Sequence, residues 1–203
     1  MRSFSEIDTI SKRASKAKGF SWGISEEVGK CIKILELFSL PGLKNLNHYL
    51  KNYDQNKFKK LKLISKKNNS ADKYHCPIIA GVNFLDQVKV LEKQNSIEFN
   101  KIAYPLIFLA FASRASEILG KKIFIKMDEK EFILNFNQSI FSNFSKIEIW
   151  ENASNILITF LENKNSFNES DWSEMNKFAN ETFVNESDEL KEKSAGAGLL
   201  DND

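Results

Sequence analysis

The chain has 203 residues, of which 42% are hydrophobic and 28% are charged, as is typical of a globular domain. Its formal net charge of +2 is too small to indicate nucleic-acid binding by itself. No apolar run is long enough to span a bilayer, and the first residues lack the apolar segment of a signal peptide. Two cysteines, Cys31 and Cys76, cannot form a disulfide framework. We therefore predict a cytoplasmic protein with no membrane partner.

Charge is distributed unevenly along the chain. Residues 51–73 carry eight lysines and two aspartates, whereas residues 181–203 carry seven acids and two lysines. The only arginines are Arg2, Arg13 and Arg114. Abundant Lys, Asn, Ile and Phe indicate an AT-rich genome, so a lysine run is a weak functional signal here. An arginine is a stronger one, because its guanidinium can bind a carboxylate through two hydrogen bonds.

The first 50 residues predict three helices with short connections. Ser3 and Glu6 form a capping-box pattern, and apolar residues follow at helical spacing at Phe4, Ile7, Ile10, Ala14 and Ala17. Gly19 is placed to end this helix. A second helix is predicted to begin near Ser21, and Pro41 to open a third. Together they predict a compact N-terminal helical unit.

The middle of the chain predicts a loop and two further helices. Residues 51–73 read as a solvated loop or a weak helix, and residues 76–92 as a helix. Pro105 and Gly120 bracket a segment that is apolar nearly all round. A helix with that composition is buried on all sides, so we expect residues 105–119 to form the central buried helix.

Beyond residue 120 the apolar period changes to two, which is typical of strands. The predicted strands are residues 121–127, 131–136, 146–150 and 155–160, and a closing helix is predicted at residues 169–184. Helices followed by a meander of strands indicate an α+β fold with a small, mostly antiparallel sheet. We predict one domain over residues 1–190, with a helical part at 1–120 and a strand-rich part at 121–162, followed by an acidic tail containing glycines at 191–203.

The histidines and cysteines do not predict a metal site. His48, His75, Cys31 and Cys76 lack the closely spaced ligand pairs of structural zinc sites, and no cofactor motif is present. Cys76 precedes Pro77 at a predicted helix start, where a thiol can be activated as a nucleophile. The alternative is a buried structural cysteine, which behaves as a small hydrophobic residue.

Two adjacent acids complete the candidate catalytic set. Glu26 and Glu27 could serve as acid or base beside Cys76, or simply stabilise the positive end of the second helix from its first turn. The lysines of residues 57–67 have charges that phosphate binding needs. No nucleic-acid-binding motif accompanies them, so no nucleic-acid partner is predicted.

The last ten residues, SAGAGLLDND, differ from an ordinary polar terminus. The glycines allow close backbone approach, the leucines can anchor, and the aspartates with the terminal carboxylate are anionic; the residues concerned are Gly196, Gly198, Leu199, Leu200, Asp201 and Asp203. We predict that this tail either docks, in cis or on a partner, or is a flexible end. Arg13 or Arg114 could receive one of its carboxylates through two hydrogen bonds.

The stretch from Glu6 to Leu43, the segment CPIIAGVNFLD at 76–86 and the ending GAGAGLLDND resemble the bacterial family catalogued as domain of unknown function 3726. The likeness extends over essentially the whole chain, and its most specific parts are the tail and Gly19–Glu27. The matching positions are Gly19, Trp22, Gly23, Glu26, Glu27, Cys76, Pro77, Gly81, Gly196, Gly198, Asp201, Asn202 and Asp203. The resemblance implies a cytosolic bacterial protein with a shared tail, and it assigns no activity and no established catalytic role to any of these residues.

Two functional hypotheses follow. The first is an accessory module of metabolism that binds a small acidic ligand or a protein partner, through Arg13, Trp22 or Arg114 and the docked tail residues Gly196, Gly198, Asp201 and Asp203. The second is a small enzyme with Cys76 as nucleophile and Glu26 or Glu27 as acid or base. Both place the site where residues 19–27, residues 76–81 and the tail would converge.

Overall fold

The computed structural model describes residues 2–54, 56–137, 139–144 and 148–183. Its contacts divide the chain into two units, Met1–Asn163 and Lys164–Asp203, which are described separately. The single domain predicted over residues 1–190 stays a prediction. Among the described residues, no helix has the length and apolarity needed to cross a membrane.

The first unit opens with the three predicted helices, α1 (Phe4–Ala17), α2 (Trp22–Leu37) and α3 (Gly42–Lys51). Ser3 and Glu6 form the expected capping box at the start of α1. The Ser21 hydroxyl accepts a hydrogen bond from the Ile24 backbone N–H at the start of α2. The local capping signals therefore set these boundaries as predicted.

Two more helices follow, α4 (Pro77–Leu91) and α5 (Pro105–Leu119), with a short 3-10 turn η1 (Glu92–Gln94) after α4. Pro105 begins α5, and Gly120 ends it with a φ of 63° in the left-handed region, where glycine carries no steric penalty. From Pro105 to Ser113 every side chain of α5 is buried. The prediction of a central buried helix is confirmed.

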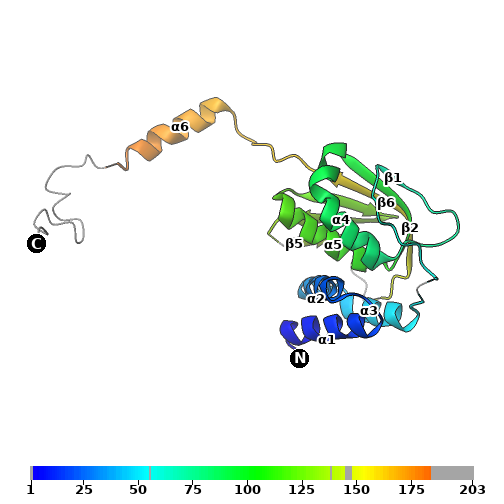
Figure 1. Cartoon of the computed structure of the whole chain (residues 1–203). Coiled ribbons are helices and arrows are strands. Elements are labelled where there is room, and N and C mark those ends of the chain that lie inside the picture. Colours follow the sequence, from blue (N-terminus) through cyan, green and yellow to red (C-terminus); the bar gives the residue numbers. More distant parts are fainter. Residues whose placement is uncertain (1, 55, 138, 145–147, 184–203) are drawn as a thin grey trace, which may run out of the picture. The chain divides into compact units, whose positions relative to one another are not determined.

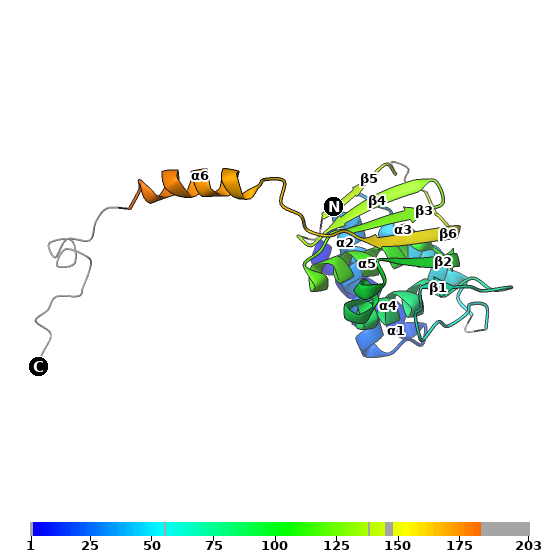
Figure 2. The ribbon, with the colours of Figure 1, turned by 90° about the horizontal axis from the view of Figure 1, so that it is seen from above.

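The sheet has six strands, β1 (Lys67–Asn68), β2 (Ser96–Ala103), β3 (Ile123–Met127), β4 (Lys130–Asn135), β5 (Ser139–Ser142) and β6 (Asn152–Phe160). The strands lie in the order β1-β2-β6-β3-β4-β5 (Figure 2). Among the strands of the described residues, β1 and β2 form the only parallel pair. The predicted α+β class with a mostly antiparallel sheet is confirmed.

The sequence missed three strands, β1, β2 and β5, and misplaced one. β2 lies inside the part predicted to be helical, and its apolar alternation breaks at Lys101, which adopts a φ of 53°. β5 has only four residues. The strand predicted at residues 146–150 is wrong where the chain is described: Glu148–Trp150 is irregular, because the Trp150 N–H donates to the Asn45 side chain (2.9 Å) instead of to a neighbouring strand.

The elements of the first unit form three layers (Figure 1). Helices α4 and α5 pack on the sheet, and α2 and α3 pack on α5 from the other side. α1 is in turn packed on α2 and α3. Since α5 contacts both the sheet and the N-terminal helices, one hydrophobic core joins all three layers.

The second unit contains the closing helix α6 (Glu169–Asn180). Asn168 and Asp171 form a capping box at its start, and the rings of Phe167 and Trp172 stack with centroids 5.5 Å apart. The helix was predicted to run to residue 184. It ends at residue 180, and residue 184 lies outside the described residues.

The contact between α4 and α5 depends on Gly81. A Cβ atom built there would overlap the Phe111 ring and lie only 2.9 Å from the Phe111 Cβ. We expect Gly81→Ala to lower the free energy of unfolding by about 1–3 kcal/mol, the usual cost of overpacking a core. Urea denaturation measures this change in the free energy of unfolding. Gly23→Ala is the matched control, since nothing lies within 4 Å of a Cβ there. Equal stability of the two variants would contradict the packing described.

Candidate functional site

Helix α1 contacts α2 through small residues. Ser11 and Ser15 are fully buried on α1, and Ser25 is fully buried on α2. At Gly29 of α2 an added Cβ would lie 2.8 Å from the Asp8 carbonyl oxygen, so the two backbones approach closely. The hydroxyls of these three serines have no hydrogen-bond partner among the described residues. The face of α1 that is buried against α2 is therefore lined by the small polar residues Ser11 and Ser15.

Two large apolar residues of α1, Phe4 and Ile10, are left on the open side of the helix, whereas Ile7 and Ala14 are partly buried against the core. Ile10 is 56% exposed and Phe4 45% exposed, and Leu43 on α3 is 39% exposed. Two hollows of about 530 Å³ and 570 Å³ lie along α1 and α3 and share Ile10 and Leu43 in their linings. The two hollows adjoin at these shared residues, and we call them together the α1–α3 groove.

The lining of the α1–α3 groove combines an apolar floor with a few charged groups. The apolar and small residues are Ile7, Ile10, Ala14, Pro41, Leu43, Leu46 and Leu50. The charged residues are Arg2, Glu6, Glu36 and Lys44. Sequence reasoning missed this site, because apolar residues at helical spacing predict a core-facing stripe, and nothing in the sequence marks Ile10 and Leu43 as exposed.

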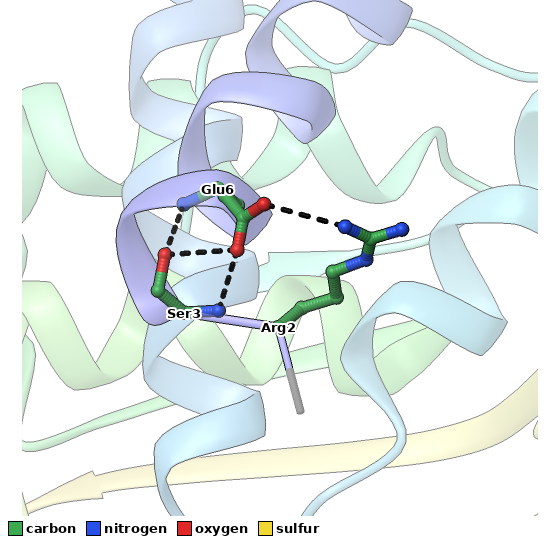
Figure 3. Close-up of polar contacts among 3 residues, drawn as sticks. All are labelled: Arg2, Ser3 and Glu6. Carbon is green, nitrogen blue, oxygen red and sulfur yellow. Dashed lines mark hydrogen bonds and ion pairs between the residues drawn. The ribbon is translucent and has the colours of Figure 1, made fainter.

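One end of the groove is a polar cluster at the start of α1 (Figure 3). The Glu6 carboxylate accepts hydrogen bonds from the Ser3 backbone N–H (2.8 Å) and the Ser3 hydroxyl (3.1 Å). These bonds, with the backbone N–H the stronger cause, lower the pKa of Glu6. Arg2 contributes least to the lowering, and its Nη1 lies 3.5 Å from Glu6 Oε1. Since the Arg2 side chain is 84% exposed, its guanidinium is accessible to a second carboxylate.

The other two arginines are placed differently. Arg114 on α5 has its Nε 2.9 Å from Oε2 of Glu27, an ion pair without the alignment of a hydrogen bond. Glu27 also pairs with Lys30 at 2.7 Å. Arg114 is only 20% exposed, so its guanidinium is half-buried and already paired with the carboxylate of Glu27. Arg13 is exposed on α1 and makes no ion pair among the described residues.

The sequence predicted Glu26 and Glu27 in the first turn of α2, but the structure places them further along the helix. α2 begins at Trp22, so the two acids fall in its second turn and the first turn contains no acid. The expected stabilisation of the positive helix end by these acids is therefore wrong. Trp22 is 55% exposed, with the Lys16 ammonium 5.5 Å from its ring centroid.

Cys76 is a buried helix cap with 1% exposure. Its Sγ lies 3.0 Å from the Tyr49 hydroxyl and accepts from the Ile79 N–H at 3.4 Å. Burial raises the pKa of this thiol against the smaller opposing effect of these hydrogen bonds. Burial also raises the pKa of Cys31. An activated nucleophile needs a lowered pKa, whereas burial acts in the opposite direction here. The role of Cys76 as a nucleophile therefore gains no support and stays a prediction. No described contact joins it to Glu26 or Glu27.

The lysines near residues 57–73 brace their own loop. Lys59 Nζ donates to the Asn69 carbonyl at 2.9 Å, and Lys73 Nζ donates to the Asn56 carbonyl at 2.7 Å. Lys101 donates in the same way to the Ala71 carbonyl. Part of the positive charge in this region therefore has a structural role.

His75 is fully buried where this loop returns to the sheet. The backbone N–H of His75 donates to the Lys101 carbonyl at 2.6 Å, and the backbone carbonyl of His75 accepts from the Ala103 N–H at 3.1 Å. The ring meets Phe99 edge-on, with centroids 6.4 Å apart. Neither ring nitrogen makes a well-aligned hydrogen bond among the described residues. Burial, followed by the charge of Lys59, lowers the pKa of His75 against a weaker opposing effect of the Asn68 backbone.

The remaining predicted site residues, Gly196, Gly198, Asp201 and Asp203, lie outside the described residues, so docking of the tail stays a prediction. Within the part of the chain that the structure describes, no group of three or more His, Cys, Asp or Glu side chains could hold a metal ion.

The fold and the groove define an α+β protein with an open, partly apolar groove on its N-terminal helices. A family model described as Protein of unknown function (DUF3726) matches residues 2–76. The match agrees with the resemblance seen in the sequence over residues 2–76, and this segment contains the whole α1–α3 groove together with Cys76. The likeness of residues 77–86 and of the ending GAGAGLLDND lies outside the match and stays a prediction. No curated protein and no solved structure matches the chain.

Burial of Cys76 has a direct chemical test. We expect iodoacetamide to leave Cys76 unmodified in the native protein at neutral pH, because the buried thiol is protonated and inaccessible. In urea both cysteines should react, which serves as the control for reagent quality. Mass spectrometry of the digested protein measures each site. Rapid native alkylation of Cys76 would contradict the placement described.

Burial of His75 predicts a pH dependence of stability. Because the folded state favours the neutral ring, the unfolded chain binds the proton more tightly. The free energy of unfolding should therefore fall as the pH drops below about 6.5, the ordinary histidine pKa. Urea denaturation at several pH values between about pH 7 and about pH 5 measures this free energy of unfolding. His75→Phe should flatten the curve of stability against pH relative to the wild type. A steep curve in His75→Phe would refute the role of His75.

Proposed function

We propose that this protein is a non-enzymatic accessory module that binds a short protein segment in the α1–α3 groove. The proposed ligand is a peptide in which one or two large aliphatic residues precede carboxylates. The observation that carries the proposal is the exposure of Ile10 and Leu43 in the α1–α3 groove. A cytoplasmic location, a bacterial origin and a role in metabolism, expected from the sequence, belong to the same proposal.

The apolar half of the proposed ligand is supported by the floor of the groove. Exposed large apolar residues that gather in one place mark interaction sites more often than scattered ones do. Ile10 and Leu43 come from different helices and lie in both hollows. A leucine side chain placed between them would remove apolar surface from water on three residues at once, which favours binding by about 25 cal/mol per Å² of buried surface.

The acidic half is supported by Arg2 at the end of the groove. Its guanidinium is held near Glu6 at 3.5 Å, longer than a strong charge-assisted hydrogen bond. A carboxylate from a ligand would add a second, better-aligned partner without breaking a buried ion pair. Arg114 is a poorer candidate, because binding a ligand there would require it to leave Glu27.

The enzymatic alternative has less support. Its proposed nucleophile, Cys76, is buried with a raised pKa, and its proposed partner Glu27 is paired with Arg114 and Lys30. Glu26 is exposed on α2. A nucleophile and its base have to lie within hydrogen-bond reach, and no described contact brings these groups together.

The natural probe for the groove is the tail sequence itself. A fluorescent peptide SAGAGLLDND should bind the full-length protein in which Leu199 and Leu200 are replaced by Asp, so that the native tail does not compete. Anisotropy measures the dissociation constant. Ile10→Asp or Leu43→Asp should weaken binding at least about tenfold, equivalent to about 1.4 kcal/mol. Arg2→Gln should weaken it less and reduce its sensitivity to salt.

Two controls make the result specific. A peptide with both leucines replaced by Asp should not bind, and Ile118→Asp should leave the affinity unchanged, since Ile118 is 45% exposed on α5 and does not line the groove. No saturable binding of the peptide, or binding that survives Ile10→Asp and Leu43→Asp, would overturn the proposed function.

A further inference from the structure

A second candidate surface lies where the loop before β1 meets α4. The Asn83 side chain donates to the Leu61 carbonyl at 3.1 Å, and the Gln87 side chain donates to the Lys62 carbonyl at 2.9 Å. The Ile64 N–H donates back to Gln87 at 3.1 Å. These three bonds fix the loop against α4, with the Ile64 side chain buried and that of Leu63 77% exposed. A large apolar side chain is thus presented to solvent by a well-held loop.

The same face of α4 continues to Val90. Residues 83, 87 and 90 follow helical spacing, so they lie on one side of the helix. Val90 is 68% exposed. We call this region the basic–apolar surface; it comprises Lys60, Lys62, Leu63, Lys66, Val90 and Lys93. Its lysines are exposed and make no ion pair among the described residues. Asp86, one turn before Val90, is an exposed carboxylate on the same side of α4.

The second unit provides the complementary chemistry. Trp172, Met175 and Phe178 recur along α6 at helical spacing and are 53%, 63% and 56% exposed. Four acids accompany them in the described part of this unit: Glu169, Asp171, Glu174 and Glu181. A helix of 12 residues is only marginally stable alone in water, so packing of its aromatic face on another surface would stabilise it.

Charge is segregated between the two units. Residues 1–163 carry 25 basic and 17 acidic residues, whereas residues 164–203 carry 4 basic and 10 acidic ones. The net charges are therefore +8 and −6. Charges of opposite sign on two surfaces accelerate their encounter and set their orientation. Two copies of the chain thus each offer a basic surface with apolar centres and an acidic helix with aromatic ones.

We propose that the basic–apolar surface of one copy binds helix α6 of a second copy. Leu63 and Val90 supply the apolar contact for the α6 aromatic residues, and the surrounding lysines face the α6 acids. A nucleic acid fits this surface less well. No arginine lies on the basic–apolar surface to read bases, and it offers no exposed aromatic ring on which a base could stack.

Self-association of the full-length protein tests the proposal. Light scattering after size exclusion should show the mass rising above the 23.3 kDa monomer as protein concentration increases, and falling back at high salt. Leu63→Asp and Trp172→Ala should each remain monomeric. Both positions are exposed, so circular dichroism and the melting temperature should match the wild type. Ile118→Asp, also exposed on α5, should associate like the wild type.

Mixing the two variants distinguishes this pairing from other routes to a dimer. Leu63→Asp retains a functional α6, and Trp172→Ala retains a functional basic–apolar surface, so the mixture should recover association that neither shows alone. A wild type that stays monomeric at every concentration would overturn the proposal, as would association that survives both substitutions. Binding of a labelled oligonucleotide that Leu63→Asp abolishes, without self-association, would instead assign the surface to nucleic acid.

Discussion

The close approach of α1 to α2 is the contact on which the candidate site depends. Ser11 and Ser15 on α1 face a helix whose Gly29 leaves no room for a side chain beside Asp8. Small residues allow two helix backbones to approach, but they occupy the face that a larger apolar stripe would otherwise fill. Ile10 and Phe4 are consequently left on the open side of α1, where Leu43 on α3 completes a groove.

The remaining layers hold this pair of helices in place. α5 is buried along most of its length between the sheet and the N-terminal helices, and the tight contact of Gly81 with Phe111 fixes α4 beside it. The half-buried ion pair between Glu27 and Arg114 ties α2 to α5. The three arginines therefore have different roles: Arg114 joins two helices, whereas Arg2 and Arg13 stay exposed on or beside α1.

The sequence predicted correctly those helices whose ends are determined by residues close to them in the chain. The Ser3–Glu6 capping box and the Pro105–Gly120 bracket predicted α1 and α5, since both depend on residues a few positions apart. β2 was missed because its apolar alternation breaks at Lys101, which adopts a left-handed backbone conformation. The groove was missed for another reason. Helical spacing shows which residues of α1 share a face, but whether α2 covers that face depends on Gly29, more than ten residues away.

Binding in the α1–α3 groove is the central claim, and a methyl nuclear magnetic resonance titration with the tail peptide SAGAGLLDND locates it most directly. The protein for this experiment carries Asp at positions 199 and 200. The account predicts shifts confined to methyl groups that line the groove, those of Ile10, Leu43 and Leu46, while the methyl groups of Ile118 and Leu63 stay unchanged. Shifts centred on Ile24 or Ile118, near the Glu27–Arg114 pair, or no shifts at saturating peptide, would contradict it.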